Sequence, residues 1–431
     1  MNGLFSIKIS IKKLGIWCTI CLFSVGLFLN GLISANALAS QTVLGTAKGG
    51  TNANTVVGAQ QNLGISDKLS ILSTNNTFPN SKTVYDTIEN MSKGRFIIVG
   101  QNNLFSQCLE SFDCADAQNW DTASTLTDQT QICSTYYNTT CLRDLVYAGG
   151  RFITIGSGGI VAQCFDSLDC GAVSSWKSAI VGNNTSIVWD GITFGQNLFV
   201  VVGNSGLMSS CSVELDCSDT NSWSTPLKIG GTTANYNDIT FGNNQFVAVD
   251  SNGAISICKN SCQSAGSWSA ASSVPNKASI NAITHSNDRF VAITTNISVT
   301  GCLYVNDCSV GANWAPLAKI SGACGDNLHT VVYGSGKFIA GGACLNISQC
   351  LETDDCTLGK NWSTMINVPA KGGYWLRSIY VKETFIFTGF GGAITSCLAT
   401  SDCSQASSWK KSTYVDGQTN RWLGLAYRKG V

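Results

Sequence analysis

The stretch from Asp190 to Trp223, DGITFGQNLFVVVGNSGLMSSCSVELDCSDTNSW, contains a pattern that repeats along the chain. The short runs 190–194 and 199–202 are rich in β-branched and aromatic residues, a third run, LMSSC, covers 207–211, and turns rich in Gly and Asn separate the three. Such runs predict strands, and a fourth strand is expected to start at Trp223. One copy is therefore four short strands joined by turns, which is the meander of a propeller blade.

Each of seven copies ends in two cysteines and a tryptophan. The first two tryptophans are 56 residues apart, and the later ones recur every 45 to 48 residues. Self-similarity at a fixed period of this size indicates stacked units of one supersecondary structure. The seven sets are Cys108/Cys114/Trp120, Cys164/Cys170/Trp176, Cys211/Cys217/Trp223, Cys258/Cys262/Trp268, Cys302/Cys308/Trp314, Cys350/Cys356/Trp362 and Cys397/Cys403/Trp409.

The two ends of the repeat region complement each other. The first copy starts at 94–98 with a second strand and lacks a first strand, whereas 423–427 reads as a first strand with no blade after it. Pairing the two closes a ring and removes the exposed sheet edges that a solenoid would leave. The predicted fold is all-β: a seven-bladed β-propeller over 94–431, with four-stranded antiparallel blades and the C-terminal strand completing the first blade.

The composition excludes some classes of function. The chain has 431 residues, of which 26 are basic, 26 acidic and only 12% charged in total. Zero net charge argues against a general binder of nucleic acid or of anionic membranes, because both need a basic excess. The sequence contains no P-loop, Ser-His-Asp set or metal-ligand cluster, so no cofactor and no metal is expected.

The N-terminus has the pattern of an export signal. Lys8, Lys12 and Lys13 precede an apolar stretch over 14–33, and Ala37-Leu38-Ala39 is a small-residue cleavage site. Residues 1–39 are therefore predicted to be a signal peptide, which places the mature protein outside the cell, in a periplasm or at the cell surface. The alternative is an uncleaved anchor, because the apolar stretch is nearly long enough to span a bilayer. After cleavage no stable membrane association is expected.

Export determines the expected oxidation state of the cysteines. The chain has 20 cysteines, and Cys18 and Cys21 fall in the predicted signal, which leaves an even 18 in an oxidising compartment. A zinc site needs four converging ligands, and only two His are present to help. Disulfides are therefore predicted within all seven repeats, and two further pairs are predicted in loops, namely Cys133–Cys141 and Cys324–Cys344.

The third strand, hairpin and tryptophan of each copy resemble the BNR or Asp-box repeat of sialidases, Ser-x-Asp-x-Gly-x-Thr-Trp. Six copies have the Asp and the seventh has Ser261, but the Gly is not kept and the Trp lies two residues further along. The resemblance implies a propeller. The FVAVG…W pattern is also similar to photosystem assembly-factor propellers, which implies protein binding. The six aspartates are Asp113, Asp169, Asp216, Asp307, Asp355 and Asp402.

These repeated residues are predicted to be structural. An Asp can accept backbone N–H bonds across its hairpin, and the Trp is expected to fill the gap between neighbouring blades. A disulfide that closes a loop of about seven residues contributes roughly 2 kcal/mol in the chain-entropy model. The alternative is a lectin with seven sites, in which each Trp stacks on a sugar.

The segment 40–93 does not fit the repeat. Residues 44–65, LGTAKGGTNANTVVGAQQNLGI, resemble the GGTGA…NLGL segment of phage tail fibres, which implies a connector or an oligomerisation element. A flexible exported linker is the alternative. A short helix is predicted over 81–91, with Ser81 as its cap.

One face of the ring is predicted to carry function. The cysteine hairpins and the first-to-second turns share a face, which we call the hairpin face. The fourth-to-first connections and second-to-third turns lie on the opposite one, the loop face, and their lengths vary more. Variable loops on a rigid scaffold are where binding sites are usually found.

The starts of the seven first strands are predicted to line a pocket on the loop face. Aromatic side chains next to Arg, Asp, Asn and His suit a sugar or a peptide, although packing between blades is the alternative for each residue. The aligned pairs are Leu142-Arg143, Trp189-Asp190, Tyr236-Asn237, Ile280-Asn281, Leu328-His329, Leu376-Arg377 and Trp422-Leu423, with Tyr136, Tyr137, Tyr374, Trp375 and Arg421 in nearby loops. The predicted ligand-binding set is Arg143, Trp189, Asp190, Tyr236, Asn237, His329, Trp375, Arg377, Arg421 and Trp422.

A sialidase-like glycoside hydrolase is the alternative function. Such an enzyme needs an arginine cluster, for which Arg143, Arg377 and Arg421 remain, and acids such as Asp190 or Asp238. No Glu is expected on the loop face, and the Arg-Ile-Pro signature of sialidases is missing. The expectation is therefore an exported, non-catalytic binding module whose partner is a protein or a glycan.

Overall fold

The computed structural model divides the chain into two units, Met1–Val84 and Tyr85–Val431. In the first unit, strands β1 (Lys8–Ser10) and β2 (Trp17–Thr19) form an antiparallel pair. The remainder of the predicted signal, the tail-fibre-like segment and the predicted helix lie outside the described residues, so they stay predictions. The structure describes residues 8–10, 17–19, 93–126, 142–322, 325, 327–370, 372–415 and 420–430.

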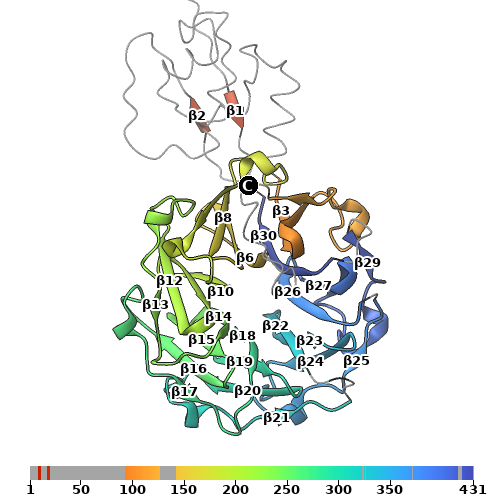
Figure 1. The fold of residues 1–431 in the computed structure, drawn as a ribbon. Coiled ribbons are helices and arrows are strands. Elements are labelled where there is room, and N and C mark those ends of the chain that lie inside the picture. The colour runs from red at the N-terminus through yellow and green to blue at the C-terminus, as the bar shows by residue number, and fades with distance from the viewer. Residues whose placement is uncertain are drawn as a thin grey trace, which may run out of the picture. The chain divides into compact units, whose positions relative to one another are not determined.

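The second unit is a ring of seven four-stranded antiparallel sheets (Figure 1). The first strands of neighbouring blades contact one another all the way round, including β26 with β30 and β30 with β6. The predicted fold is therefore confirmed. In the order first to fourth strand, blade 1 is β30 (Trp422–Arg428), β3 (Arg95–Gly100), β4 (Leu104–Leu109) and β5 (Ser124–Thr125); blade 2 is β6 (Leu142–Ala148), β7 (Arg151–Gly156), β8 (Ile160–Phe165) and β9 (Lys177–Ile180); blade 3 is β10 (Trp189–Gly195), β11 (Leu198–Gly203), β12 (Leu207–Ser212) and β13 (Leu227–Lys228).

The other four blades follow the same order. Blade 4 is β14 (Tyr236–Gly242), β15 (Gln245–Asp250), β16 (Ala254–Cys258) and β17 (Ser272–Ser273); blade 5 is β18 (Ile280–His285), β19 (Arg289–Thr294), β20 (Ser298–Leu303) and β21 (Ala318–Lys319); blade 6 is β22 (Leu328–Gly334), β23 (Lys337–Gly342), β24 (Asn346–Leu351) and β25 (Ile366–Asn367); blade 7 is β26 (Trp375–Val381), β27 (Thr384–Gly389), β28 (Ala393–Leu398) and β29 (Thr413–Tyr414).

The C-terminal strand closes the ring as predicted. Strand β30 pairs antiparallel with β3, with Phe96 opposite Tyr427 and Ile98 opposite Leu425. The fourth strands differ from the prediction, because they start after the tryptophan: β13 begins at Leu227, and Trp223 forms an isolated bridge with Cys211. A short 3-10 turn, which the sequence did not predict, precedes each tryptophan.

The hydrophobic core lies between adjacent blades rather than within them. Phe105 of blade 1, for example, packs in one cluster with Cys164 and Trp176 of blade 2. The indole Nε1 of each tryptophan donates to the backbone carbonyl of its second cysteine, at 2.8 to 3.1 Å in all seven blades. The repeated tryptophans are therefore buried packing residues, as predicted, and cannot stack on seven exposed sugars.

The cysteine hairpins are tied internally by the seven predicted within-repeat disulfides, whose Cα–Cα distances are 5.7 to 6.0 Å. The first cysteine of each pair lies in the third strand of its blade, whereas the second lies beyond the end of that strand, in the turn. All fourteen are buried, so they serve packing and cross-linking and offer no contact to a ligand. The pairs are Cys108–Cys114, Cys164–Cys170, Cys211–Cys217, Cys258–Cys262, Cys302–Cys308, Cys350–Cys356 and Cys397–Cys403.

The Asp-box aspartates shape the same hairpins. The Oδ1 of each of the six accepts the backbone N–H two residues further on, as Asp216 does from Ser218 at 3.0 Å. This Asx turn holds the hairpin in shape, so the structural role predicted for the aspartates is confirmed.

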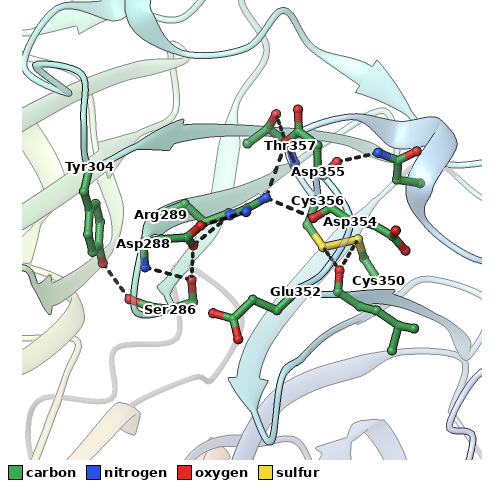
Figure 2. A network of polar contacts seen from close by, with 12 residues as sticks. Ser286, Asp288, Arg289, Tyr304, Cys350, Glu352, Asp354, Asp355, Cys356 and Thr357 are labelled. Atoms are coloured by element: carbon green, nitrogen blue, oxygen red, sulfur yellow. Dashed lines mark hydrogen bonds and ion pairs between the residues drawn. A yellow bond between two sulfur atoms is a disulfide. The ribbon is translucent and has the colours of Figure 1, made fainter.

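Neighbouring hairpins are also joined to one another. Arg289, at the start of β19 in blade 5, reaches the hairpin of blade 6, where it donates to the Asp354 carbonyl at 3.0 Å and lies 3.4 Å from Asp355 (Figure 2). Asp288 holds the same guanidinium from its other side at 2.8 Å. Arg151 bridges blades 2 and 3 in the same way, through the carbonyls of Val213 and Leu215. The hairpin face is therefore occupied by contacts that hold the ring together.

Candidate binding site

Each first strand has a β-bulge at its start. In every blade the pairing register shifts by one residue there, for example between Trp189 and Gly191 in β10. A bulge inserts one unpaired residue and redirects its side chain, and bulges are common at barrel rims and beside active sites. We number the residue before the bulge position 1, the bulged residue position 2 and the next one position 3.

The bulged residues surround a cavity of about 200 Å³ on the ring axis, which we call the mouth. Position 2 of all seven blades contributes to it, and position 3 contributes only Arg377. The structure therefore brings together Arg143, Asp190, Asn237, His329 and Arg377 of the predicted ligand-binding set, with Asn281, Leu376 and Leu423 of the aligned pairs. Asn281, Leu376 and Leu423 were among the aligned pairs but not in the predicted ligand-binding set, although they occupy the same repeat position as its members.

Four predicted aromatic residues do not line the mouth. Trp189, Tyr236, Trp375 and Trp422 occupy position 1, and each is fully buried in an inter-blade cluster. A position 1 side chain points between blades because the bulge that follows it sends position 2 toward the axis. The predicted alternative, packing between blades, is the observed one.

Two of the predicted arginines are placed differently from the expectation. In blade 7 the bulge follows Trp375, so Leu376 occupies position 2, and Arg377 is position 3 rather than the equivalent of Asp190. Arg421 precedes β30, and its guanidinium lies over the Phe390 ring at 4.0 Å from the ring centre. The three arginines therefore do not converge on one point.

Both arginines of the mouth are paired with carboxylates. Arg143 Nη1 donates to Asp190 Oδ1 at 2.6 Å, and Arg377 Nε lies 3.6 Å from Asp144 Oδ1. The second pair crosses blade 1, where position 3 is Gly424. A Cβ on that glycine would lie 2.9 Å from the backbone of Asp144, so glycine allows the close approach that this pair needs. The charges at the mouth largely compensate one another.

Large and small residues alternate at position 3 around most of the ring. Asp144 in blade 2 and Asp238 in blade 4 each accept one N–H from their own strand and one from the next blade, namely from Ile192 and Ile283. Their neighbours are small. In order from blade 1, position 3 is Gly424, Asp144, Gly191, Asp238, Ala282, Thr330 and Arg377.

Burial controls the protonation of these groups. It raises the pKa of Asp144 and of Asp190, against the opposing effect of the nearby arginines. Burial raises the pKa of Asp238 to about 7, with Arg377 opposing and Asp144 adding to the shift. It also lowers the pKa of His329 to about 4, so this imidazole is neutral at physiological pH.

The two asparagines of the mouth connect blades and keep an acceptor. Asn237 Nδ2 donates to the Ile280 carbonyl at 2.7 Å, and Asn281 Nδ2 donates to the Leu328 carbonyl at 2.6 Å. Their Oδ1 atoms have no partner within the described part of the chain. His329 Nε2 is buried there without a hydrogen bond as well. The mouth therefore offers hydrogen-bonding atoms without a strong net charge.

A larger cavity of about 570 Å³ lies on the hairpin face between blades 6 and 7. Its main cation, Lys337, already donates to the carbonyls of Ala399 and Ser401 at 2.7 and 2.6 Å. Gln349 donates to Asp402 at 3.2 Å in the same groove. Because these contacts repeat the inter-hairpin ties of the other blades, we regard this groove as structural.

The additional predicted disulfides are only partly described. Cys344, in the β23–β24 turn on the loop face, is disulfide-bonded. Its predicted partner Cys324, and the predicted pair Cys133–Cys141 with Tyr136 and Tyr137, lie outside the described residues. These pairings therefore stay predictions. In the described residues no group of His, Cys, Asp and Glu is arranged to hold a metal ion.

Comparisons with known proteins assign no family to this chain. No protein-family model and no curated protein matches the sequence. The computationally designed Ika8 protein matches with a TM-score of 0.46 and 11% identity, over 77% of this chain and 96% of that chain. The WD40 β propeller domain of Doa1 matches with a TM-score of 0.46 and 13% identity, over 65% and 92%. The seven-bladed assignment rests on the strand order and register described above.

Proposed function

We propose that this chain is a non-catalytic binding module and that its ligand is a glycan whose uncharged terminal unit enters the mouth. The observation that carries the proposal is the composition of the mouth, in which Arg143 and Arg377 are each matched by a carboxylate and His329 is neutral. A site without strong net charge but with free amide oxygens suits hydroxyl groups better than a carboxylate or an ammonium group.

The size of the mouth supports the same ligand class. Ligand pockets for drug-sized molecules usually measure about 300–1,000 Å³, and the mouth is smaller. One sugar ring or one small group is therefore its natural occupant. Leu376 and Leu423 form an apolar side of the pocket, opposite to the asparagines, which suits a ring with one polar and one apolar face.

The arginine geometry favours binding over sialidase-like hydrolysis. A carboxylate-bearing substrate would have to displace Asp190 from Arg143 and Asp144 from Arg377 before either arginine could clamp it. Arg421, the third arginine, is stacked on Phe390. The mouth therefore lacks the assembled clamp that such an enzyme uses.

The disulfides support an extracellular place of action. Seven hairpin disulfides are typical of a protein in an oxidising environment. We propose that the protein acts outside the cell, in a periplasm or at the cell surface. Within the described residues, none of the helices combines the length and apolarity that a membrane span requires.

A variant that blocks the mouth tests the proposal. Leu423→Trp places an indole in a cavity of about 200 Å³ without removing either ion pair. We expect the wild type to bind uncharged glycans on a glycan array and the variant to lose at least ten-fold in affinity while keeping its melting temperature. The matched control is Val305→Trp, at a hairpin-face residue that is 90% exposed, and it should bind as the wild type does.

Two results would contradict the proposal. One is equal glycan binding by Leu423→Trp and the wild type. The other is turnover of a fluorogenic sialoside by the wild type that disappears in Arg377→Ala, since that would establish catalysis at the mouth.

A further inference from the structure

A row of side chains in ring contact leads away from the mouth on the loop face. The ring centres of His329 and Tyr374 are 5.5 Å apart in an edge-on arrangement, and those of Tyr374 and Phe390 are 5.1 Å apart. The Arg421 guanidinium completes the row over Phe390. We call Tyr374, Phe390 and Arg421 the aromatic strip. His329 belongs to both the mouth and the row, so the strip is continuous with the pocket.

The strip differs from the other exposed apolar residues of the chain. Tyr374 is 38% exposed. The remaining exposed large hydrophobic residues among those the structure describes all lie in or directly after cysteine hairpins, on the opposite face. They are Phe112, Leu215, Val305, Val310, Leu351 and Leu398. Within the described ranges, the loop face therefore has one exposed aromatic site, and it adjoins the mouth.

The backbone holds the strip in place. Phe390 N–H donates to the Tyr374 carbonyl at 3.1 Å, and Gln101 N–H donates to the Arg421 carbonyl at 3.0 Å. Tyr374 also forms an isolated bridge with Ala343 of blade 6. Blades 6, 7 and 1 thus fix the strip before any ligand arrives, which lowers the entropy lost on binding.

We infer that the aromatic strip is a second subsite, which binds the sugar unit next to the one in the mouth. This inference rests on the proposed function. The exposed face of Tyr374 would stack on the C–H face of a pyranose, and the Arg421 guanidinium, stacked by its own face, keeps its N–H edge for hydroxyl groups. The ligand is therefore an uncharged oligosaccharide of at least two units rather than a single sugar.

The test is the dependence of affinity on chain length. Purified protein is titrated calorimetrically with galactose, glucose, mannose and N-acetylglucosamine, and with their neutral di- and trisaccharides. We expect the best oligosaccharide to bind the wild type about ten-fold more tightly than its own monosaccharide, as stacking on an aromatic ring allows. Tyr374→Ala should remove this gain and leave monosaccharide binding unchanged.

Two further variants make the result specific. Tyr374→Phe keeps the ring and should keep the gain. Phe112→Ala removes an aromatic side chain that is 56% exposed on the hairpin face, and it should behave as the wild type. The melting temperature shows whether a variant folds. If Tyr374→Ala does not fold, Tyr374→Phe still tests the aromatic side chain. Loss of the affinity gain in a folded Tyr374→Phe would overturn a stacking role for Tyr374.

The possible failures can be told apart. If monosaccharides bind and chain length adds nothing, or if Tyr374→Ala keeps the gain, the second subsite is overturned and the proposed function stands. If no neutral sugar binds, both are overturned. Binding only to carboxylate-bearing glycans, or only to peptides on a peptide array, overturns the inference by naming a different ligand.

Discussion

Asp238 shows what a single residue does at the inner edge of a blade. Its two carboxylate oxygens accept backbone N–H groups of Ile239 and Ile283, at 2.8 and 2.9 Å, and so join blades 4 and 5. The same burial that makes these bonds strong disfavours the charged form and raises the pKa of the carboxyl to about 7. The residue is an inter-blade connector whose protonation changes in the physiological range.

Because of this pKa, the contribution of Asp238 to the stability of the ring should fall as pH rises, whereas the lowered pKa of His329 acts in the opposite direction below its ordinary value of 6.5. The folded state holds a proton on Asp238 up to about pH 7, whereas the unfolded chain releases it near pH 3.8, so the stabilisation is lost between these values as pH increases. Asp238→Asn cannot titrate. We expect its melting temperature to fall less than that of the wild type between pH 5 and pH 8.

The control for this experiment is Asp307→Asn. Asp307 is an exposed hairpin carboxylate whose pKa is lowered by hydrogen bonds from Ser309, so it does not titrate between pH 5 and pH 8. This variant should follow the wild type, and the same slope in Asp238→Asn would contradict the assignment.

For single residues, the sequence predicted which pairs lie at the mouth but not which member of each pair faces the ring axis. The sequence shows a pair such as Trp189-Asp190 in all seven copies, yet strand alternation alone does not tell which member of the pair faces the axis. The bulge decides it, because its extra residue shifts the alternation of the side chains by one at that point. In blade 7 two apolar residues in succession, Trp375 and Leu376, also shifted the alignment by one.

The cysteine hairpin is the element that repeats most faithfully. Its disulfide, its tryptophan and, in six copies, its Asx turn each fix one part of the same loop, and in several blades an arginine or lysine of the preceding blade, such as Arg151, donates to carbonyls of the hairpin. All of this was predictable because the contacts are local, except for the links between hairpins. Those links join residues far apart in the sequence, such as Arg151 and Leu215 at 64 positions, and no local pattern reports them.

Removing one hairpin disulfide should weaken the ring by a limited amount. The variant Cys211→Ser with Cys217→Ser frees a loop of about seven residues, and we expect the free energy of unfolding to fall by about 2 kcal/mol. Denaturant unfolding followed by tryptophan fluorescence measures this. Reducing agent should destabilise the variant less than the wild type, and a loss several times larger would mean that the disulfide maintains more than its own loop.

The whole molecule depends on one non-local pairing, between β30 and β3. Tyr427 adds to it by donating to Glu110 Oε2 at 2.6 Å, and Lys382 pairs with Glu110 from blade 7. The sequence predicted this closure because the two ends of the repeat are complementary.

Deleting residues 420–431 tests the closure. The deletion exposes β3 as a sheet edge and leaves Phe96 and Ile98 without their partners, so we expect aggregation or strand-exchanged oligomers. Light scattering after size-exclusion chromatography measures the mass. Adding a peptide of residues 420–431 should restore a monomer, and a truncated chain that is monomeric without the peptide would contradict the role of β30.

The alternation at position 3 has a consequence for stoichiometry. A ring with an odd number of members cannot alternate completely, and here the pattern breaks where Ala282 and Thr330 stand side by side. No rotation about the axis maps the mouth onto itself, although the seven hairpins around it are nearly equivalent. The scaffold is therefore close to seven-fold symmetric while its centre is not, so a ligand at the mouth should occupy one orientation, with one molecule bound per chain.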